Sequence, residues 1–81
     1  MRVSISFYSY IKDLTGCPQA TENLSEGCTL EELYRTLSLR FPKLAQLEKP
    51  VLMAVGVDYQ PRSYRLREGD EVSLFPPVQG G

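Results

Sequence analysis

Apolar and polar side chains alternate strictly at the start of the chain. Within residues 2–8 one face is apolar, with Val3, Ile5 and Phe7. The alternate positions form a second, polar face that ends at Tyr8. A period of two is typical of a β-strand with one buried face.

The alternation breaks after this strand. Residues 9–16 end at a glycine, which predicts a short helical turn with Ile11 and Leu14 facing inward. A weaker strand is predicted near residues 19–24, and residues 25–27 have the composition of a turn.

The clearest element begins at Thr29. Thr29 and Glu32 match a capping box, in which each side chain accepts a hydrogen bond from the backbone N–H of the other residue. The residues that follow place one apolar stripe at helical spacing: Leu30, Leu33, Tyr34, Leu37 and Phe41. Leu39 falls on the opposite side, and Pro42 ends the helix. A single apolar stripe on the main helix requires a sheet to cover it.

Further strands are predicted in the second half of the chain. Residues 51–57 are almost wholly apolar, which favours a central strand flanked on both sides. Gly56 can take a positive φ and begin a reversal. Pro61 then blocks a long inner strand. Residues 65–70 are expected to form a turn, and residues 71–75 the last strand.

The order of these elements predicts the fold class. A strand, a second strand, a helix and then further strands indicate an α+β domain, with one main helix packed across a mixed sheet. This domain is expected to span residues 1–75, and the loop between Pro42 and residue 51 is rich in Leu44, Leu47 and Pro50. Residues 76–81 are expected to form a flexible tail, because no apolar anchor follows Val78.

Size and charge narrow the classes of function. With 81 residues the chain is long enough for one modest core. A formal net charge of −1 gives no basis for binding nucleic acid or an anionic membrane. No apolar run approaches the roughly 20 residues that cross a bilayer, and the alternating start lacks a signal-peptide core. A cytoplasmic location is the expectation.

Few side chains could support catalysis. The chain has no histidine, which excludes Ser-His-Asp chemistry and histidine metal sites. Cys17 and Cys28 cannot complete a usual zinc site, and both are expected to be free thiols. The carboxylates at residues 31–32 and 68–71 fall in a helix first turn and a polar turn, where solvated groups are expected. No metal or cofactor is expected to be bound by the chain itself.

The last strand leads into an unusual ending. Alternation directs Val72 and Leu74 to the core and leaves Phe75 on the outer face. The chain then ends in Pro-Pro-Val-Gln-Gly-Gly, residues 76–81. An outer-face aromatic residue beside such an ending indicates a contact surface, although a lone exposed Phe is common in proteins without that role.

Four stretches of the sequence together resemble a known family. They are Lys12-Asp-Leu-Thr-Gly16, Ala54-Val55, Gly69-Asp-Glu-Val72 and Phe75-Pro-Pro-Val-x-Gly-Gly81. With these motifs the whole chain resembles the small subunits of molybdopterin synthase, which are sulfur carriers with the ubiquitin-like β-grasp fold. Thiazole-pathway sulfur carriers are similar in fold and ending, but the Pro-Pro-Val lead-in and the length favour the molybdopterin branch.

The resemblance implies that Gly81 is the reacting residue. In that family an activating enzyme uses ATP-Mg to adenylate the C-terminal carboxylate, and a sulfur donor protein displaces AMP to leave a thiocarboxylate. The thiocarboxylate gives its sulfur to cyclic pyranopterin monophosphate in the active site of the large synthase subunit. The implied assembly contains two small and two large subunits, and the small subunit is a sulfur donor rather than the catalyst.

The resemblance also assigns roles to residues near the chain end. Delivery of Gly81 is expected to depend on the residues before it: Pro76, Pro77, Val78 and Gly80. Prolines hold an extended form, and glycine carries no side chain that would block a narrow channel. Contact with the partners is expected at three positions where the family has an aromatic, an apolar and a basic residue: Phe75, Tyr59 and Lys12. Tyr59 is more polar than the aliphatic residue that the family often has there.

Two positions depart from the family pattern, and other functions stay open. Gly56 stands where asparagine is usual, and because both residues adopt left-handed turns, the backbone is expected to be preserved. Ser63 stands where aspartate is common, which puts one loop hydrogen bond in question. The rivals are a ubiquitin-like modifier joined to lysines through Gly81, and a plain binding domain with an accidental ending.

Overall fold

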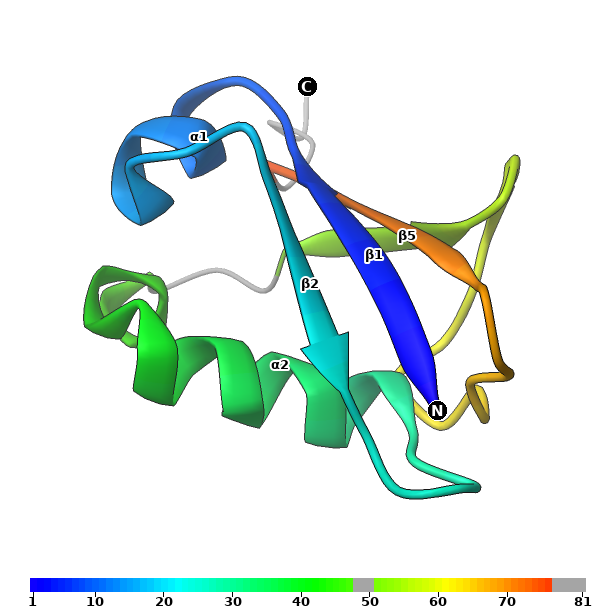
Figure 1. Cartoon of the computed structure of the whole chain (residues 1–81). Helices are drawn as coiled ribbons and strands as arrows, with labels where there is room; N and C mark the ends of the chain where they lie inside the picture. Colours follow the sequence, from blue (N-terminus) through cyan, green and yellow to red (C-terminus); the bar gives the residue numbers. More distant parts are fainter. Residues whose placement is uncertain (48–50, 77–81) are drawn as a thin grey trace.

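The computed structural model describes residues 1–47 and 51–76. Within them the elements are β1 (Arg2–Phe7), α1 (Tyr10–Thr15), β2 (Gln19–Asn23), α2 (Leu30–Arg40), the 3-10 helix η1 (Pro42–Gln46), β3 (Leu52–Val55), β4 (Asp58–Tyr59) and β5 (Glu71–Phe75). The helix α2 lies across one face of the sheet, and α1 packs beside η1 at one end (Figure 1). The predicted α+β architecture is confirmed.

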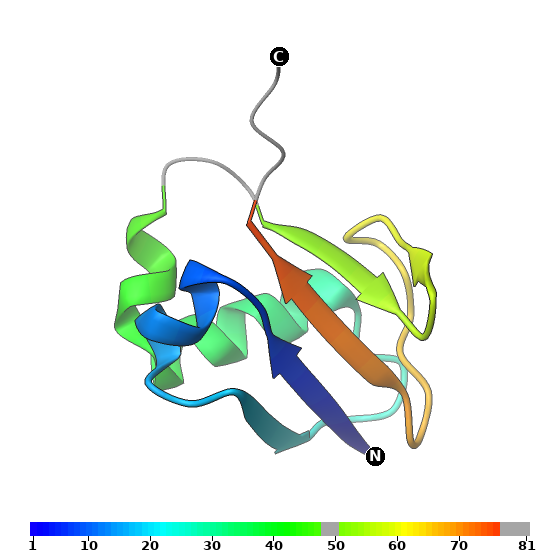
Figure 2. The same cartoon turned by 90° about the horizontal axis from the view of Figure 1, so that it is seen from above.

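The strands of the described residues form one mixed sheet in the order β2-β1-β5-β3-β4. β1 and β5 run parallel, with Ile5 opposite Val72 and Phe7 opposite Leu74. The remaining neighbours pair antiparallel. Figure 2 shows β1, β5 and β3 side by side, so the first and last strands of the described residues are neighbours at the middle of the sheet.

The prediction of a central strand over residues 51–57 is only partly right. β3 is flanked on both sides, but it is shorter, and β5 holds the central position. The strand stops because Gly56 takes a φ of 61° and its N–H donates to the carbonyl of Glu71 at 2.9 Å. Val57 is then 96% exposed in the turn. The left-handed geometry expected of Gly56 is confirmed.

The core lies between α2 and the sheet. Leu30, Leu33 and Leu37 are fully buried, whereas Leu39 on the opposite side of α2 is 85% exposed, so the predicted helical phase is confirmed. Across the interface the sheet contributes four almost fully buried side chains: Val3, Ile5, Val72 and Leu74.

The position predicted for Phe41 is only partly right. Phe41 follows the last residue of α2 with a φ of −125° and so leaves the helical stripe. Its ring is half-buried and packs edge-to-face on Phe7, with the ring centroids 5.7 Å apart.

The first turn of α2 is held by its own capping box and by hydrogen bonds to loop 60–66. The predicted capping box is present, since Glu32 N–H donates to Thr29 Oγ1 and Thr29 N–H donates to Glu32 Oε1, both at 3.2 Å. The N–H groups of Leu30 and Glu31 donate to loop carbonyls, those of Tyr64 and Arg62, at 3.0 Å. These backbone hydrogen bonds attach the loop to the start of α2. Ser63, where the family commonly has aspartate, lies exposed in this loop.

The segment predicted as a loop between Pro42 and residue 51 begins with the helix η1 instead. Pro42 lies at the start of this short helix, where a backbone N–H would have no partner within the helix, so its absence in proline costs nothing. Leu44 is buried, and its carbonyl accepts a hydrogen bond from the Tyr34 hydroxyl at 2.9 Å. Burial also raises the pKa of the Tyr34 hydroxyl, which keeps it protonated as the donor. Residues 48–50 lie outside the described residues.

Candidate functional site

Phe75 ends β5 on the face of the sheet that α2 does not cover. Val72 and Leu74 point into the core and are almost fully buried, so strand alternation turns Phe75 to the other face. On that face the register places Leu52 of β3 beside Phe75. The outer-face position predicted for Phe75 is confirmed.

Two tyrosine rings hold Phe75, and the three residues Tyr8, Tyr59 and Phe75 are called the aromatic cluster below. The Tyr8 ring stacks on Phe75 with centroids 4.8 Å apart and an interplanar angle of 10°. The Tyr59 ring meets Phe75 edge-on at 6.0 Å and 71°. Both are favoured geometries for aromatic pairs.

The strand register builds this cluster from three separate parts of the chain. Phe7 lies opposite Leu74, and Tyr8 N–H donates to the Leu74 carbonyl at 3.1 Å, so Tyr8 comes beside Phe75. Ala54 lies opposite both Ser73 of β5 and Tyr59 of β4, which places the Tyr59 side chain on the same face of the sheet as Phe75. Tyr8 is 45% and Tyr59 67% exposed. The cluster therefore offers aromatic surface to solvent, as anchor residues of protein interfaces do.

The structure brings some of the predicted site residues together. Phe75 and Tyr59 are in contact as partners in the cluster. Lys12 is exposed on α1 and lies outside the cluster. Pro76 directly follows the cluster and is half-buried. The other predicted tail residues lie outside the described residues: Pro77, Val78, Gly80 and Gly81.

Tyr8 was missed by sequence reasoning, which assigned it only to a polar face. A signal was available, because Tyr8 continues the alternation of Ser4 and Ser6 on the outer face. What the pattern lacked was the parallel pairing of β1 with β5, and that pairing alone places Tyr8 beside Phe75.

Several carboxylates of the described residues make contacts that hold the fold. Glu31 pairs with Arg62 at 2.9 Å and with Arg35 at 3.7 Å. Glu68 accepts a hydrogen bond from Arg2 N–H at 3.0 Å, and Asp70 accepts one from Arg67 N–H at 2.9 Å. These are loop and helix-end contacts, not a paired acid and base in a cleft.

The Cys28 thiol also lacks the surroundings of a nucleophile. Cys17 and Cys28 are both free, and Cys28 is buried. Burial raises the pKa of the Cys28 thiol, and the nearby Glu32 carboxylate raises it further. A thiol in that environment stays protonated at neutral pH and is a poor nucleophile.

Two other features are absent from residues 1–47 and 51–76: a metal-binding cluster and a membrane-spanning helix. No three side chains of the types His, Cys, Asp and Glu gather there as a possible metal site. No helix in that part of the chain has the length and hydropathy to cross a membrane.

Comparison with known families shows to which family the chain belongs. A model described as the ThiS family matches residues 5–81, which is nearly the whole chain. The chain belongs to the ThiS family.

Individual relatives of this ThiS-family chain agree in length and shape. It is 31% identical to the molybdopterin synthase sulfur carrier subunit of Escherichia coli (strain K12), over 98% of this chain and 99% of that protein. It matches a chain from the protein–protein complex of subunits 1 and 2 of molybdopterin-converting factor from Helicobacter pylori, with 26% identity, a TM-score of 0.69 and full coverage of both chains.

The fold itself is clearest from a more distant structure. SAMP1 from Haloferax volcanii superposes with a TM-score of 0.87 over the full length of both chains, at 18% identity. The fold is the ubiquitin-like β-grasp fold, so the expectation from the sequence motifs is confirmed. The resemblance to molybdopterin synthase sulfur carrier subunits is confirmed as well.

Proposed function

We propose that this ThiS-family chain is the sulfur-carrier subunit of a molybdopterin synthase. The main support is the end-to-end match to the Escherichia coli sulfur carrier subunit. The Helicobacter pylori relative, solved as a complex of subunits 1 and 2 of its converting factor, supports a large-subunit partner. The proposed assembly has two small and two large subunits, with the active site in the large one.

The proposed chemistry begins at the C-terminal carboxylate of Gly81. A carboxylate is ionised near neutral pH, since its reference pKa is about 3.5, and is a poor electrophile. An activating enzyme therefore transfers AMP from ATP-Mg to the carboxylate, with release of pyrophosphate. A sulfur nucleophile at the oxidation level of hydrosulfide attacks the acyl carbon, AMP leaves, and a thiocarboxylate remains. The thiocarboxylate then donates its sulfur to cyclic pyranopterin monophosphate.

The described residues contribute the docking surface for this transfer. The aromatic cluster lies at the end of β5, directly before Pro76. Pro76 cannot donate to a strand ladder, which favours an end to the sheet at that point. The six residues from Pro76 to Gly81 can span about 20 Å when extended, so a large subunit bound on the cluster lies within reach of Gly81.

The Phe75→Ala variant should bind the large subunit more weakly by about 2 kcal/mol or more, because central aromatic anchors dominate such interfaces. The variant should remain folded, since Phe75 lies on the outer face and the core residues Val72 and Leu74 are unchanged. Calorimetric titration against the large subunit measures the binding, and circular dichroism checks the fold.

Two further variants make this prediction decisive. Tyr59→Ala removes a 67% exposed ring of the same cluster and should weaken binding without unfolding the chain. Leu39→Ala removes an 85% exposed side chain from α2, on the far side, and should leave binding unchanged. Wild-type affinity in both cluster variants would show that the partner docks elsewhere.

Intact mass spectrometry of the protein isolated from its host tests the proposed function. Exchange of one oxygen for sulfur at Gly81 supports the carrier. Adducts of high mass that disappear when Gly81 is deleted would instead identify a modifier joined to other proteins. Unmodified protein alone, isolated while its host makes molybdopterin, would contradict both and leave a plain binding domain.

A further inference from the structure

The strand β2 lies at one edge of the sheet and leaves backbone groups unpaired. In an antiparallel pair, hydrogen-bonded and non-bonded residues alternate. Phe7 N–H donates to the Pro18 carbonyl at 2.9 Å, and Leu24 N–H donates to the Met1 carbonyl at 2.7 Å. Because these two bonds belong to the bonded positions, every second residue between Pro18 and Leu24 bonds to β1, namely Ala20 and Glu22. The N–H and C=O groups of the residues between and beside them point away from the sheet: Gln19, Thr21 and Asn23.

The opposite edge of the sheet is formed by β4, which is too short to pair well with another strand. β4 has only two residues, and Pro61 follows shortly after it. A short strand and a nearby proline are common ways to stop another chain from pairing with a sheet edge. β2 has five residues and no proline within it, so it is the edge with a template for another strand.

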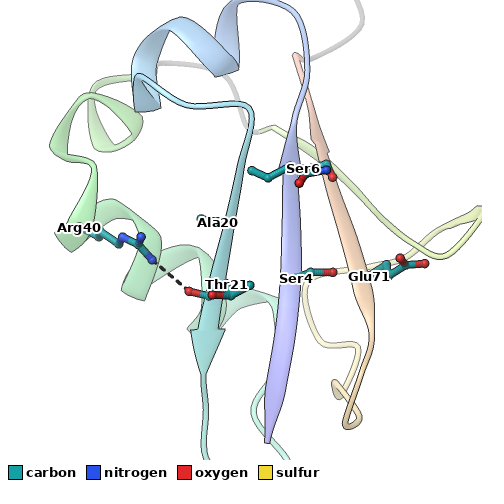
Figure 3. Close-up of a pocket in the computed structure, with 7 residues that line it drawn as sticks. Ser4, Ser6, Ala20, Thr21, Arg40 and Glu71 are labelled. Atoms are coloured by element: carbon teal, nitrogen blue, oxygen red, sulfur yellow. Dashed lines mark hydrogen bonds between the residues drawn. The ribbon is translucent and has the colours of Figure 1, made fainter.

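A single side chain covers the middle of the β2 edge. Arg40, the last residue of α2, donates from Nη1 to the Thr21 carbonyl at 3.0 Å (Figure 3). The same nitrogen donates to the Glu22 carboxylate at 2.9 Å. The guanidinium carbon also lies 5.1 Å from the centre of the Phe41 ring. Three contacts therefore hold the guanidinium in place over the edge.

The surface beside this edge is open. A depression of about 520 Å³ runs along β2, where it is bordered by Arg40 and by the core-face residue Ala20. The rest of its lining comes from polar residues of the outer face: Ser4, Ser6, Gln19, Thr21 and Glu71. In Figure 3 Arg40 approaches β2 from the α2 side, and Ser4 and Glu71 lie on the other side of the strand.

We propose that Arg40 guards the β2 edge against pairing with β2 of a second copy of the chain. An antiparallel pairing centred on Thr21 would place the two Thr21 residues opposite each other, and Gln19 opposite Asn23 of the copy. This register uses every outward-pointing group of β2. It requires the Thr21 carbonyl, which Arg40 occupies. Natural sheets use charged side chains in this way to keep edges unpaired.

The variant Arg40→Met tests the guard. Methionine keeps an unbranched, helix-favouring side chain over Phe41 but has no donor for Thr21. The dimerisation constant from sedimentation equilibrium should rise at least about tenfold, because the pairing regains backbone hydrogen bonds at Thr21. Arg35→Met is the matched control, since Arg35 is an exposed arginine of α2 that pairs with Glu31 and not with the edge. It should behave as the wild type does.

A second change locates the new contact. Thr21→Pro in the Arg40→Met background removes the central outward N–H, so the protein should return to the wild-type association constant. In Arg40→Met the amides of Gln19, Thr21 and Asn23 should exchange hydrogen more slowly as protein concentration rises. An unchanged constant in Arg40→Met, or a dimer that survives Thr21→Pro, would overturn the proposal.

A milder variant decides the matter if Arg40→Met does not fold. Glu22→Gln weakens the ion pair that holds Arg40 while leaving every backbone group of β2 in place. Its dimerisation constant should lie above that of the wild type. A constant equal to the wild-type value would overturn the guard role of Arg40.

Discussion

Deletion of Gly81 should abolish sulfur transfer while leaving thermal stability nearly unchanged. The reacting carboxyl would move about 3.5 Å back along the chain, and transfer requires reacting atoms within about 3–3.5 Å of each other. The fold should tolerate the change because the buried side chains of the described core lie between Val3 and Leu74. Activity is measured as molybdopterin formed from the cyclic precursor by the large subunit and chemically thiocarboxylated chain.

A variant with one extra residue after Gly81 tests whether the position of the terminal carboxylate matters, and not only the length of the tail. One residue added after Gly81 should be as damaging as the deletion, since it converts the Gly81 carboxylate to a peptide bond and moves the new terminus past the reacting position. Both variants should melt at the wild-type temperature. Full activity from the Gly81-deleted protein would falsify the carrier function.

Leu37→Ala should lower the free energy of unfolding by about 2–5 kcal/mol, as large-to-small changes in a packed core do. Leu37 is fully buried between α2 and the sheet. A small domain has only about 5–15 kcal/mol of net stability, so this one change removes a large share of it. Urea unfolding at constant pH, followed by circular dichroism, measures the difference.

Leu39→Ala is the internal control for that experiment. It makes the same substitution two residues along the same helix, but at a side chain that is 85% exposed. The expected cost is well under about 1 kcal/mol, as at most surface positions. Equal losses at the two sites would contradict the side of α2 assigned to the core.

The parts of the fold that were predictable from sequence depend on local signals. The capping box at Thr29 and Glu32 and the apolar stripe through Leu37 fix the start and the buried side of α2 within one short segment. Strand alternation likewise placed Phe75 on the outer face of β5. Each of these predictions needed only residues a few positions apart.

The features that escaped prediction depend on contacts between distant segments. The central place of β5 follows from its parallel pairing with β1, which joins the first and last strands of the described residues. The same pairing puts Tyr8 on Phe75. The cover that Arg40 provides for the β2 edge joins residues 19 positions apart. No periodicity within a single segment encodes these neighbours, because they depend on the order of strands in the sheet.

The most direct test of the sulfur-carrier function is to follow one labelled sulfur atom. The chain is prepared with isotopically labelled sulfur in a thiocarboxylate at Gly81, mixed with the large subunit and cyclic pyranopterin monophosphate, and the molybdopterin formed is analysed by mass spectrometry. If the chain is the sulfur carrier, the label appears in the dithiolene of the product and Gly81 returns to a carboxylate. Molybdopterin that forms without the label, while the labelled thiocarboxylate stays intact at Gly81, would contradict the sulfur-carrier function.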